Sequence, residues 1–264
     1  MTGRTAIIAG RGALPAAVAA ACEGPLVAAM EGFAPEGLVP EITFRVERLV
    51  PFMRALEDVG VTRLVFAGAV ARPRLDPALF DPATAQMVPR LLAAMQAGDD
   101  ATLREVLAIF EEHGFATAGV ADVAPGLIPA AGVLAGEVRD ADRADADRAA
   151  RIVAALGAVD VGQGAVVARG LCLAVEALPG TDAMLAGVAA IDPALRPQGG
   201  LFWKAAKPGQ DLRIDLPTLG PATVEGAARA GLGGIAWAAG EVICLDLPGM
   251  IATARARGLF LWAR

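Results

Sequence analysis

The 264-residue chain contains no serine, no asparagine and no tyrosine, and its one histidine is His113. A Ser-His-Asp apparatus is therefore excluded, and so is a cluster of histidine metal ligands. His113 stands in "EEHGF", just before Gly114, where a surface or helix-capping role is favoured over catalysis. An enzyme with this composition has to work with Asp, Glu, Lys, Arg, Thr, Gln, backbone amides and a hard metal ion.

Cysteine is also scarce, and acidic residues outnumber basic ones by 29 to 23. Cys22, Cys172 and Cys244 are far apart, form no CxxC pair and stand in apolar settings, which predicts buried, reduced thiols in a cytoplasmic protein. The net charge of −6 argues against a nucleic-acid partner. No basic N-terminal segment leads into an apolar run with a cleavage site, so no export signal is expected. Gly, Pro or charge interrupts every apolar run before it reaches spanning length, so no transmembrane helix is expected.

The length favours two compact domains, with one large domain as the alternative, and the 55% hydrophobic content allows a sizeable core. Residues 1–133 alternate strand-like and helix-like patterns. The strand-like runs are 5–10, 25–30, 42–46 and 63–70, and the helical stretches are 14–22, 50–60, 83–96 and 100–113. This order predicts a parallel sheet with crossover helices, which is a Rossmann-like α/β domain.

The pattern changes near residue 134, where "GEVRDADRADADRAARIV" is charged and poor in large apolar groups. We expect a linker over 134–141 and a helix that begins near Asp142. Strand-like runs then follow closely, among them "GAVVARG", "LCLAVEA", "GLFWKAA" and "LFLWA", with helical stretches at 181–190, 221–230 and 247–257. Residues 142–264 are therefore predicted to form a second, mixed α/β domain with more hairpin character.

Two glycine-containing loops of the first domain are candidate anion sites. "AGRGALP" (9–15) follows a strand and opens a helix, with Gly10, Gly12 and Leu14 followed by Pro15 in the place of a third glycine. A plain tight turn is the alternative, and the incomplete glycine fingerprint disfavours a dinucleotide. "FAGAVARP" (66–73) is a second loop of this kind and carries Gly68 and Arg72. Both loops follow strands, so one crevice at the strand ends could hold both.

Several acids and polar residues lie close to predicted helix starts or strand ends. In "AGDD", Asp99 and Asp100 are expected to cap the following helix, with the crevice as the alternative. In the second domain, Gln163, Glu176, Thr181 and Asp182 follow strand-like runs. For Thr181 and Asp182, capping of the helix at 181–190 and a role in a pocket are given equal weight.

The densest polar segment is "WKAAKPGQDLRIDLPTLGPAT" (203–223), which holds Lys204 and Lys207, the chain's only lysines. Read as an extended segment, "DLRID" places Asp211, Arg213 and Asp215 on one face. Carboxylates arranged in this way suit Mg²⁺ with a substrate phosphate, and Lys and Arg suit the charge of that phosphate. Hydrolysis would need a metal-bound or carboxylate-activated water. A solvated edge with ion pairs is the alternative.

These motifs together resemble one known family. "AGRGALP", "FAGAVARP", "GDD" before "LREVLAIFEEHGF", "DVGQGAVV", "AVEALPGTDAML" and "KAAKPGQDLRIDLPTLGPATVE" look like the UDP-2,3-diacylglucosamine pyrophosphatase of lipid A biosynthesis. This pyrophosphatase family is unrelated to the calcineurin-like metallophosphoesterases that catalyse the same reaction in other bacteria. The resemblance runs almost end to end and keeps the order of the motifs.

The resemblance implies an activity and a cofactor. Members of the family cleave the diphosphate of UDP-2,3-diacylglucosamine with water and a divalent cation, commonly Mg²⁺. Water attacks the α-phosphorus, and the products are UMP and 2,3-diacylglucosamine 1-phosphate (lipid X). The resemblance also implies two linked domains that hold the lipid product, and a peripheral location on the cytoplasmic face of the inner membrane. It leaves a homodimer open.

Residue roles follow as hypotheses. Asp215 is expected to hold the metal or the attacking water, with Asp211 as its nearest rival. Lys207, which is counted with them among the catalytic residues, would neutralise phosphate charge together with Lys204 and Arg213. The remaining candidate substrate contacts are Gly10, Gly12, Leu14, Pro15, Gly68, Arg72, Asp99, Asp100, Gln163, Glu176, Thr181, Asp182, Gln210, Thr218 and Thr223. Two other functions stay open: a nucleotide-sugar oxidoreductase that uses the glycine loop, and a non-catalytic sensor of a phospholipid precursor.

Overall fold

The structure, a computed structural model, describes residues 3–71 and 73–264. The chain divides into two compact units. The first contains the chain up to Pro125 together with a distant segment, Asp211–Asp215. The second contains Gly126–Gln210 and Leu216–Arg264.

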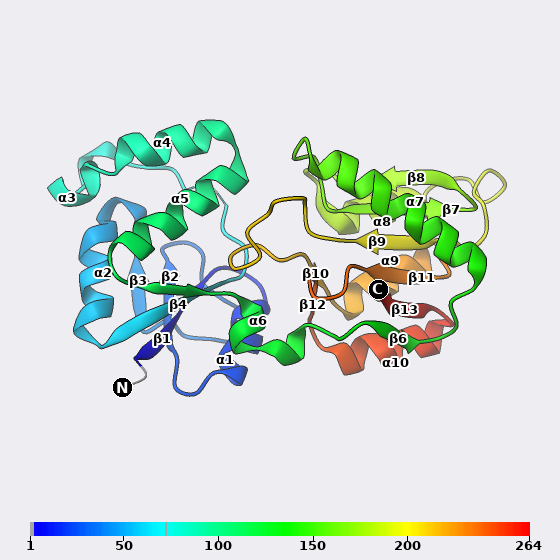
Figure 1. Cartoon of the computed structure of the whole chain (residues 1–264), viewed down its shortest axis with the longest axis horizontal. Coiled ribbons are helices and arrows are strands. Elements are labelled where there is room, and N and C mark those ends of the chain that lie inside the picture. The colour runs from blue at the N-terminus through cyan, green and yellow to red at the C-terminus, as the bar shows by residue number, and fades with distance from the viewer. Residues whose placement is uncertain (1–2, 72) are drawn as a thin grey trace. The chain divides into compact units, whose positions relative to one another are not determined.

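The first unit is built on a five-stranded parallel sheet (Figure 1). Its strands are β1 (Arg4–Ala9), β2 (Leu26–Met30), β3 (Ile42–Phe44), β4 (Val61–Ala67) and β5 (Ala116–Ala118), in the order β3-β2-β1-β4-β5. All five residues of β2 are buried, as expected for a strand with helices on both faces. The chain turns back between β1 and β4, so this is a doubly wound sheet. The predicted Rossmann-like architecture is confirmed.

Short helices connect these strands. They are α1 (Leu14–Ala21), α2 (Leu49–Asp58), α3 (Pro82–Ala85), α4 (Val88–Ala97), α5 (Asp99–Glu112) and α6 (Val120–Val123), with 3-10 turns at Val46–Arg48, Pro77–Leu79 and Pro125–Leu127. The stretch predicted as one helix over 83–96 is in fact two helices. Pro89 explains the break, because it lacks an N–H group and is suited to the first turn of the new helix α4.

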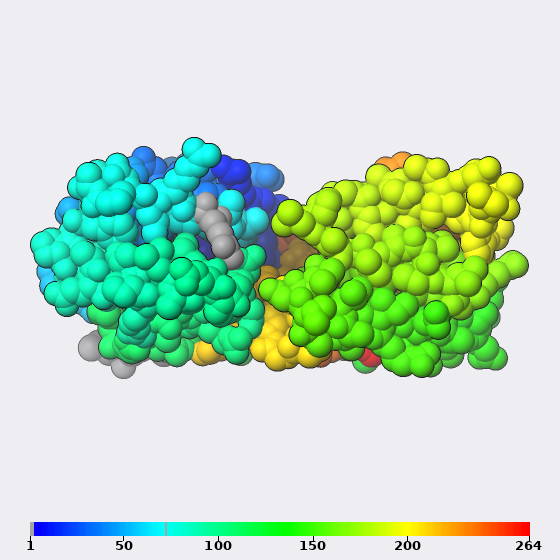
Figure 2. All heavy atoms as spheres, turned by 90° about the horizontal axis from the view of Figure 1, so that it is seen from above, coloured from blue at the N-terminus to red at the C-terminus, as the bar shows by residue number. Residues whose placement is uncertain are grey.

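The core of the first unit lies between the sheet and helices α2, α4 and α5. Phe110 of α5 is at its centre, with the rings of Phe52, Phe66 and Phe115 in edge-to-face contact at centroid distances of 5.8 to 6.3 Å. Side chains of α4 and α5 cover the outside of this unit in the view of Figure 2. Helices α1 and α6 pack on the sheet separately from this core (Figure 1).

The second unit has a six-stranded mixed sheet in the order β6-β13-β11-β9-β7-β8. Its central strands β9 (Leu201–Lys204), β11 (Gly234–Trp237) and β13 (Phe260–Ala263) are parallel. The antiparallel strands β6 (Gly132–Ala135), β7 (Gly164–Ala168) and β8 (Leu171–Val175) extend the sheet at its two edges. A separate parallel pair joins β10 (Thr218–Leu219) to β12 (Ile243–Cys244). The predicted mixed sheet with hairpin character is confirmed.

Helices cover both faces of this second sheet. Helix α7 (Asp140–Gly157) packs Ala146, Ala149 and Val153 against one face. Helices α8 (Gly180–Ala189), α9 (Pro221–Arg229) and α10 (Leu247–Arg257) pack against the other, around Phe202 and Trp237. Each unit is therefore a layered α/β structure with its own core.

Two expectations about the second unit need correction. The segment expected to be a linker over 134–141 is partly strand, because β6 pairs with β13 up to Ala135, and α7 begins at Asp140 rather than near Asp142. Cys172 is exposed, since it lies on the edge strand β8, whereas Cys244 is buried and burial raises the pKa of its thiol to about 12. None of the helices in residues 3–71 and 73–264 is long and apolar enough to cross a membrane.

Candidate functional site

The two glycine-containing loops of the first unit meet at the carboxyl ends of β1 and β4. Arg11 and Ala69 exchange two backbone hydrogen bonds, Arg11 N to Ala69 O at 2.9 Å and Ala69 N to Arg11 O at 3.0 Å. Gly10 N also donates to Ala67 O at 2.8 Å. Since β1 and β4 flank the point at which the strand order reverses, the loops lie where open α/β sheets bind ligands.

Glycine is required in both loops because their backbones approach so closely. A Cβ atom added to Gly10 would lie 2.6 Å from the carbonyl oxygen of Ala69. One added to Gly68, where φ is +95°, would lie 2.8 Å from the carbonyl oxygen of Arg11. Helix α1 begins immediately afterwards, at Leu14, with Pro15 in its first turn and no side chain capping it. Arg72, the predicted basic residue of the second loop, lies outside the described residues.

A third segment, Asp211–Asp215, joins the first unit beyond the end of β5. The Cα atom of Arg213 lies 3.2 Å from the position that a Cβ would take on Gly119, the residue after β5. The segment is a turn, so the prediction of an extended strand with one-sided side chains is wrong. Asp211 causes the turn: its Oδ1 accepts the Arg213 N–H at 3.0 Å, and its carbonyl accepts the Ile214 and Asp215 N–H groups at 3.3 and 3.4 Å.

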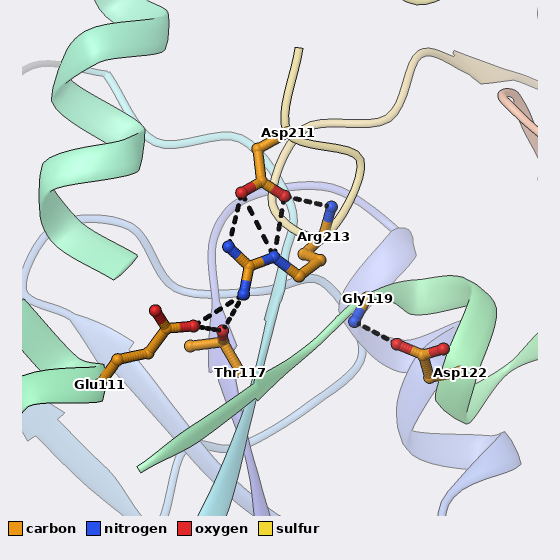
Figure 3. Close-up of polar contacts among 6 residues, drawn as sticks. All are labelled: Glu111, Thr117, Gly119, Asp122, Asp211 and Arg213. Atoms are coloured by element: carbon orange, nitrogen blue, oxygen red, sulfur yellow. Dashed lines mark hydrogen bonds and ion pairs between the residues drawn. The ribbon is translucent and has the colours of Figure 1, made fainter. Parts of the chain in front are cut away.

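Arg213 holds this turn to the elements beside it (Figure 3). Its Nε and Nη2 donate to the carboxylate of Asp211, the shortest distance being 2.6 Å. Its Nη1 donates to Glu111 Oε1 on α5 at 2.7 Å and to Thr117 Oγ1 on β5 at 2.9 Å. The Thr117 hydroxyl donates in turn to Glu111. The guanidinium therefore joins the turn to α5 and β5. In sequence, Arg213 is 102 residues from Glu111 and 96 residues from Thr117.

These contacts keep the carboxylates ionised. Hydrogen bonds from Arg213 lower the pKa of Asp211 below its ordinary value of 3.8. The Thr117 hydroxyl, and then Arg213, lower the pKa of Glu111 below 4.5. Hydrogen bonding to Asp211 raises the pKa of Arg213. One guanidinium thus faces two carboxylates, so the cluster of these three charges is an acidic one.

The second unit contains a buried polar cluster at the carboxyl end of β9. Lys204 Nζ donates to both carboxylate oxygens of Glu176, at 2.8 and 2.7 Å, and to Thr181 Oγ1 at 2.8 Å. Thr181 also donates to Glu176 Oε1 at 2.6 Å. Lys204 and Glu176 are only 4% and 8% exposed, so the ammonium group uses its three protons inside the protein. Thr181 is a member of this cluster and does not cap α8.

The other predicted residues of "KPGQ" form a turn after β9. Gln210 Oε1 accepts from Gln163 Nε2 at 2.9 Å and from the Lys207 backbone N–H at 2.8 Å. The Lys207 ammonium group pairs with Asp160, a residue with a left-handed backbone at φ +56°. The structure therefore brings Gln163, Lys207 and Gln210 together, as expected for one polar patch.

Several predicted residues have local roles in this structure. Asp99 and Asp100 lie in the first turn of α5 after the cap residue Gly98, so the predicted side-chain cap is wrong, although acids there still favour the helix dipole. Asp182 similarly lies in the first turn of α8. Thr218 Oγ1 is 3.4 Å from the Leu216 carbonyl, and Thr223 Oγ1 accepts from the Gly220 N–H at the start of α9. His113 Nδ1 contacts the Ile109 carbonyl at 2.7 Å at the end of α5, and the predicted capping role is confirmed.

Glu111, Thr117 and Asp160 are polar partners that sequence analysis did not single out. Each pairs with a residue of the 203–223 segment that lies 47 to 102 residues away. Glu111 and Asp160 lie in the motifs "LREVLAIFEEHGF" and "DVGQGAVV", but neither motif indicates which distant residue would be the partner. Only the folded arrangement identifies them.

The described residues form no group of three or more His, Cys, Asp or Glu side chains that could hold a metal ion. Arg213 already donates to both carboxylate oxygens of Asp211. The donor set therefore does not form a cage made by the protein alone. The described carboxylates would supply only one or two ligands to a cation, and water and substrate phosphates would have to supply the others, as is common for Mg²⁺ in proteins.

The protein is of the α/β class and has two units. In the first unit the strand order reverses between β1 and β4, and open α/β sheets bind ligands at such a point. Residues 4–127 match the LpxI N-terminal domain family and residues 130–262 match the LpxI C-terminal domain family. The chain therefore belongs to the LpxI family. It is 40% identical over 267 aligned residues to the UDP-2,3-diacylglucosamine pyrophosphatase LpxI of Caulobacter vibrioides, and the alignment covers 97% of this chain and 95% of that protein.

Proposed function

We propose that this protein hydrolyses the diphosphate of UDP-2,3-diacylglucosamine and gives 2,3-diacylglucosamine 1-phosphate and UMP, a step of lipid A biosynthesis. The observation that carries the proposal is the alignment to a pyrophosphatase of this name over nearly the full length of both chains. The matches to both domain families support it, since they cover the two glycine loops as well as the polar segment 203–223.

In the proposed reaction, water attacks the α-phosphorus, which is the one bonded to uridine. The bond from this phosphorus to the bridging oxygen breaks, and the bridging oxygen leaves with the lipid-linked sugar phosphate. The water oxygen therefore becomes part of UMP. Asp215 is our candidate for orienting this water or accepting its proton, with Asp211 as the second candidate.

The chain's own groups can meet the charge of the diphosphate. In the first unit, Gly10, Gly12 and Gly68 carry no side chains of their own, and helix α1 begins at Leu14 after the cap residue Ala13, whose side chain makes no capping hydrogen bond. In the second unit, Lys207 is the cation of the "KPGQ" turn, and Gln163 and Gln210 lie beside it. We propose each of these two sets of residues, taken by itself, as a candidate for binding phosphate oxygens. In the second unit, Lys204 would hold Glu176 and Thr181 in place.

We further propose a divalent cation, Mg²⁺ being the first choice, with Asp215 as its first ligand and Asp211 as its rival. When bound, such a cation would offset charge on the phosphate oxygens and lower the pKa of a bound water. Asp211 would have to exchange hydrogen bonds from Arg213 for the cation.

Two alternatives from the sequence can be weighed against the family. A nucleotide-sugar oxidoreductase would use the glycine loop for a dinucleotide, but the close approach of the two loops accounts for Gly10 and Gly68. A non-catalytic sensor would bind the lipid precursor without turnover. The alignment to a pyrophosphatase supports hydrolysis over both. Because the proposed substrate carries two acyl chains, we also propose that the protein acts peripherally at the cytoplasmic face of the inner membrane.

The test is a product assay with purified protein, UDP-2,3-diacylglucosamine in detergent micelles and Mg²⁺, read by mass spectrometry. We expect equal amounts of UMP and the 1-phosphate. Excess EDTA should stop the reaction, and added Mg²⁺ should restore it. Binding of the substrate without turnover, across Mg²⁺, Mn²⁺ and Co²⁺, would support the sensor instead. Full turnover in excess EDTA would remove the cation from the proposal but leave the hydrolysis intact.

A further inference from the structure

The guanidinium group of Arg213 is bound by other groups of the protein and does not present its charge to a ligand. It was expected to neutralise phosphate, yet its Nε, Nη1 and Nη2 all donate to groups of the protein. Two of the acceptors are carboxylates, Asp211 and Glu111, so the positive charge of the guanidinium is more than offset where it lies. A phosphate would have to compete with these two carboxylates for the donors of the guanidinium.

The geometry points instead to mechanical anchoring. The turn Asp211–Asp215 belongs to the first unit, whereas the chain on either side of it, at Gln210 and Leu216, belongs to the second. A turn of five residues has no core of its own. The described side-chain contacts from Arg213 to Glu111 on α5 and Thr117 on β5 attach this turn to regular elements, and the close approach of the Arg213 backbone to Gly119 adds a steric fit.

We propose that Arg213 is a positioning residue: with Glu111 and Thr117 it fixes the Asp211–Asp215 turn on the first unit, and thereby fixes where the Asp215 carboxylate stands. The link to Asp215 is short, because its backbone N–H closes the same turn on the carbonyl of Asp211. Arginine suits this task, since its planar fork can bind a carboxylate through two nitrogens while a third reaches other acceptors. The catalytic part of this inference depends on the proposed function, but the anchoring part does not.

The experiment compares Arg213→Met, Arg213→Lys, Glu111→Gln and Thr117→Val with the wild type. The control is Arg90→Met, which removes two other ion pairs of α5, those of Glu105 and Glu112, and changes no residue of the turn. The first measurement is hydrogen–deuterium exchange of peptides that cover 208–219. We expect faster exchange there in Arg213→Met, and to a smaller extent in Glu111→Gln and Thr117→Val, and wild-type exchange in Arg90→Met.

The second measurement is steady-state kinetics with UDP-2,3-diacylglucosamine. Misplacing a reacting group by about 1 Å can lower a rate about 100-fold, so we expect kcat of Arg213→Met to fall by about that factor while KM stays within about threefold. Arg213→Lys should recover only part of kcat, because lysine keeps the charge but not the fork. If Arg213→Met does not fold, Glu111→Gln and Thr117→Val carry the test, since they retain the guanidinium and remove only its anchors.

The outcomes are distinct. A rise in KM of more than tenfold with kcat unchanged would mean that Arg213 binds substrate, and would overturn the inference. Unchanged exchange over 208–219 in all four variants would also overturn it. Absence of turnover by the wild type would contradict the proposed function alone, and the exchange measurement would still decide whether Arg213 anchors the turn.

Discussion

The ammonium nitrogen of Lys204 lies 2.8 and 2.7 Å from the two carboxylate oxygens of Glu176, and neither side chain is more than 10% exposed. One of only two lysines in the chain is therefore used for a buried ion pair. Taking two charges out of water is unfavourable, so such a pair persists only when its hydrogen bonds are satisfied, and here Thr181 completes the set. Removing one partner should leave the other charge buried and unpaired.

Lys204→Met should lower the free energy of unfolding by about 3–5 kcal/mol, because Glu176 would keep a buried charge without its partner. The double variant Lys204→Met, Glu176→Leu should recover most of this loss, since no buried charge remains. Thr181→Val is a milder control that removes the two hydrogen bonds of the Thr181 hydroxyl, each worth about 1 kcal/mol, and leaves both charges in place. Urea unfolding followed by circular dichroism measures all three. A stability of Lys204→Met equal to that of the wild type would show that the pair has no structural role.

The two glycines of the first loop should respond differently to alanine. In Gly10→Ala the new Cβ would meet the Ala69 carbonyl at 2.6 Å, so the two loops have to separate, at a cost of about 1–3 kcal/mol. In Gly12→Ala nothing lies within 4 Å, and only the backbone at φ +92° is strained, at a cost of about 1 kcal/mol. Gly10→Ala should therefore lower turnover more than Gly12→Ala does. Equal effects on stability and turnover would contradict the close packing of the two loops.

The ion pairs of Arg213 should contribute to the pH dependence of stability. Asp211 and Glu111 have a lower pKa in the folded protein than their ordinary values of 3.8 and 4.5. Their contribution is therefore present above those values and is lost as pH falls through the lowered ones. In Arg213→Met the loss of stability on acidification below pH 4.5 should be less steep than in the wild type, although solvent and salt screen these partly exposed groups. Identical slopes in urea unfolding between pH 6 and pH 3 would contradict this.

Asp215 is our first candidate for the attacking water or the cation. Asp215→Asn should lower kcat by roughly 100- to 10,000-fold, the range for removing a general acid or base, with the circular dichroism spectrum retained. Asp58→Asn, at the exposed end of α2, changes charge equally and serves as the control. Near-normal turnover of Asp215→Asn would transfer the role to Asp211.

Much of the fold could be predicted from sequence because strand-like runs ending in glycine, and helices ending before glycine, are local signals. "TAIIAG" and "RLVFAG" became the neighbouring strands β1 and β4, and their loops meet as the parallel order implied. Where the predicted secondary structure was wrong, the cause was the chemistry of a single residue. Asp211 bonds to the backbone two residues later and turns "DLRID", and Pro89 divides a helix that periodicity predicted to be continuous.

The partners within the polar segment could not be predicted, because they depend on tertiary structure. The pairs of Lys204 with Glu176 and of Arg213 with Glu111 span 28 and 102 residues. A single sequence gives no distance between such residues. From the sequence, Lys204, Lys207 and Arg213 were all expected to bind phosphate. In the structure, Lys204 forms a buried ion pair, Lys207 forms a more exposed ion pair, and Arg213 holds the turn to α5 and β5.

The most direct test of the central claim is turnover of UDP-2,3-diacylglucosamine in ¹⁸O-water, with the products analysed by mass spectrometry. Attack of water on the α-phosphorus predicts one ¹⁸O atom in UMP and none in 2,3-diacylglucosamine 1-phosphate. Label in the lipid product instead would place the attack on the other phosphorus, and the absence of both products would contradict the proposed hydrolysis.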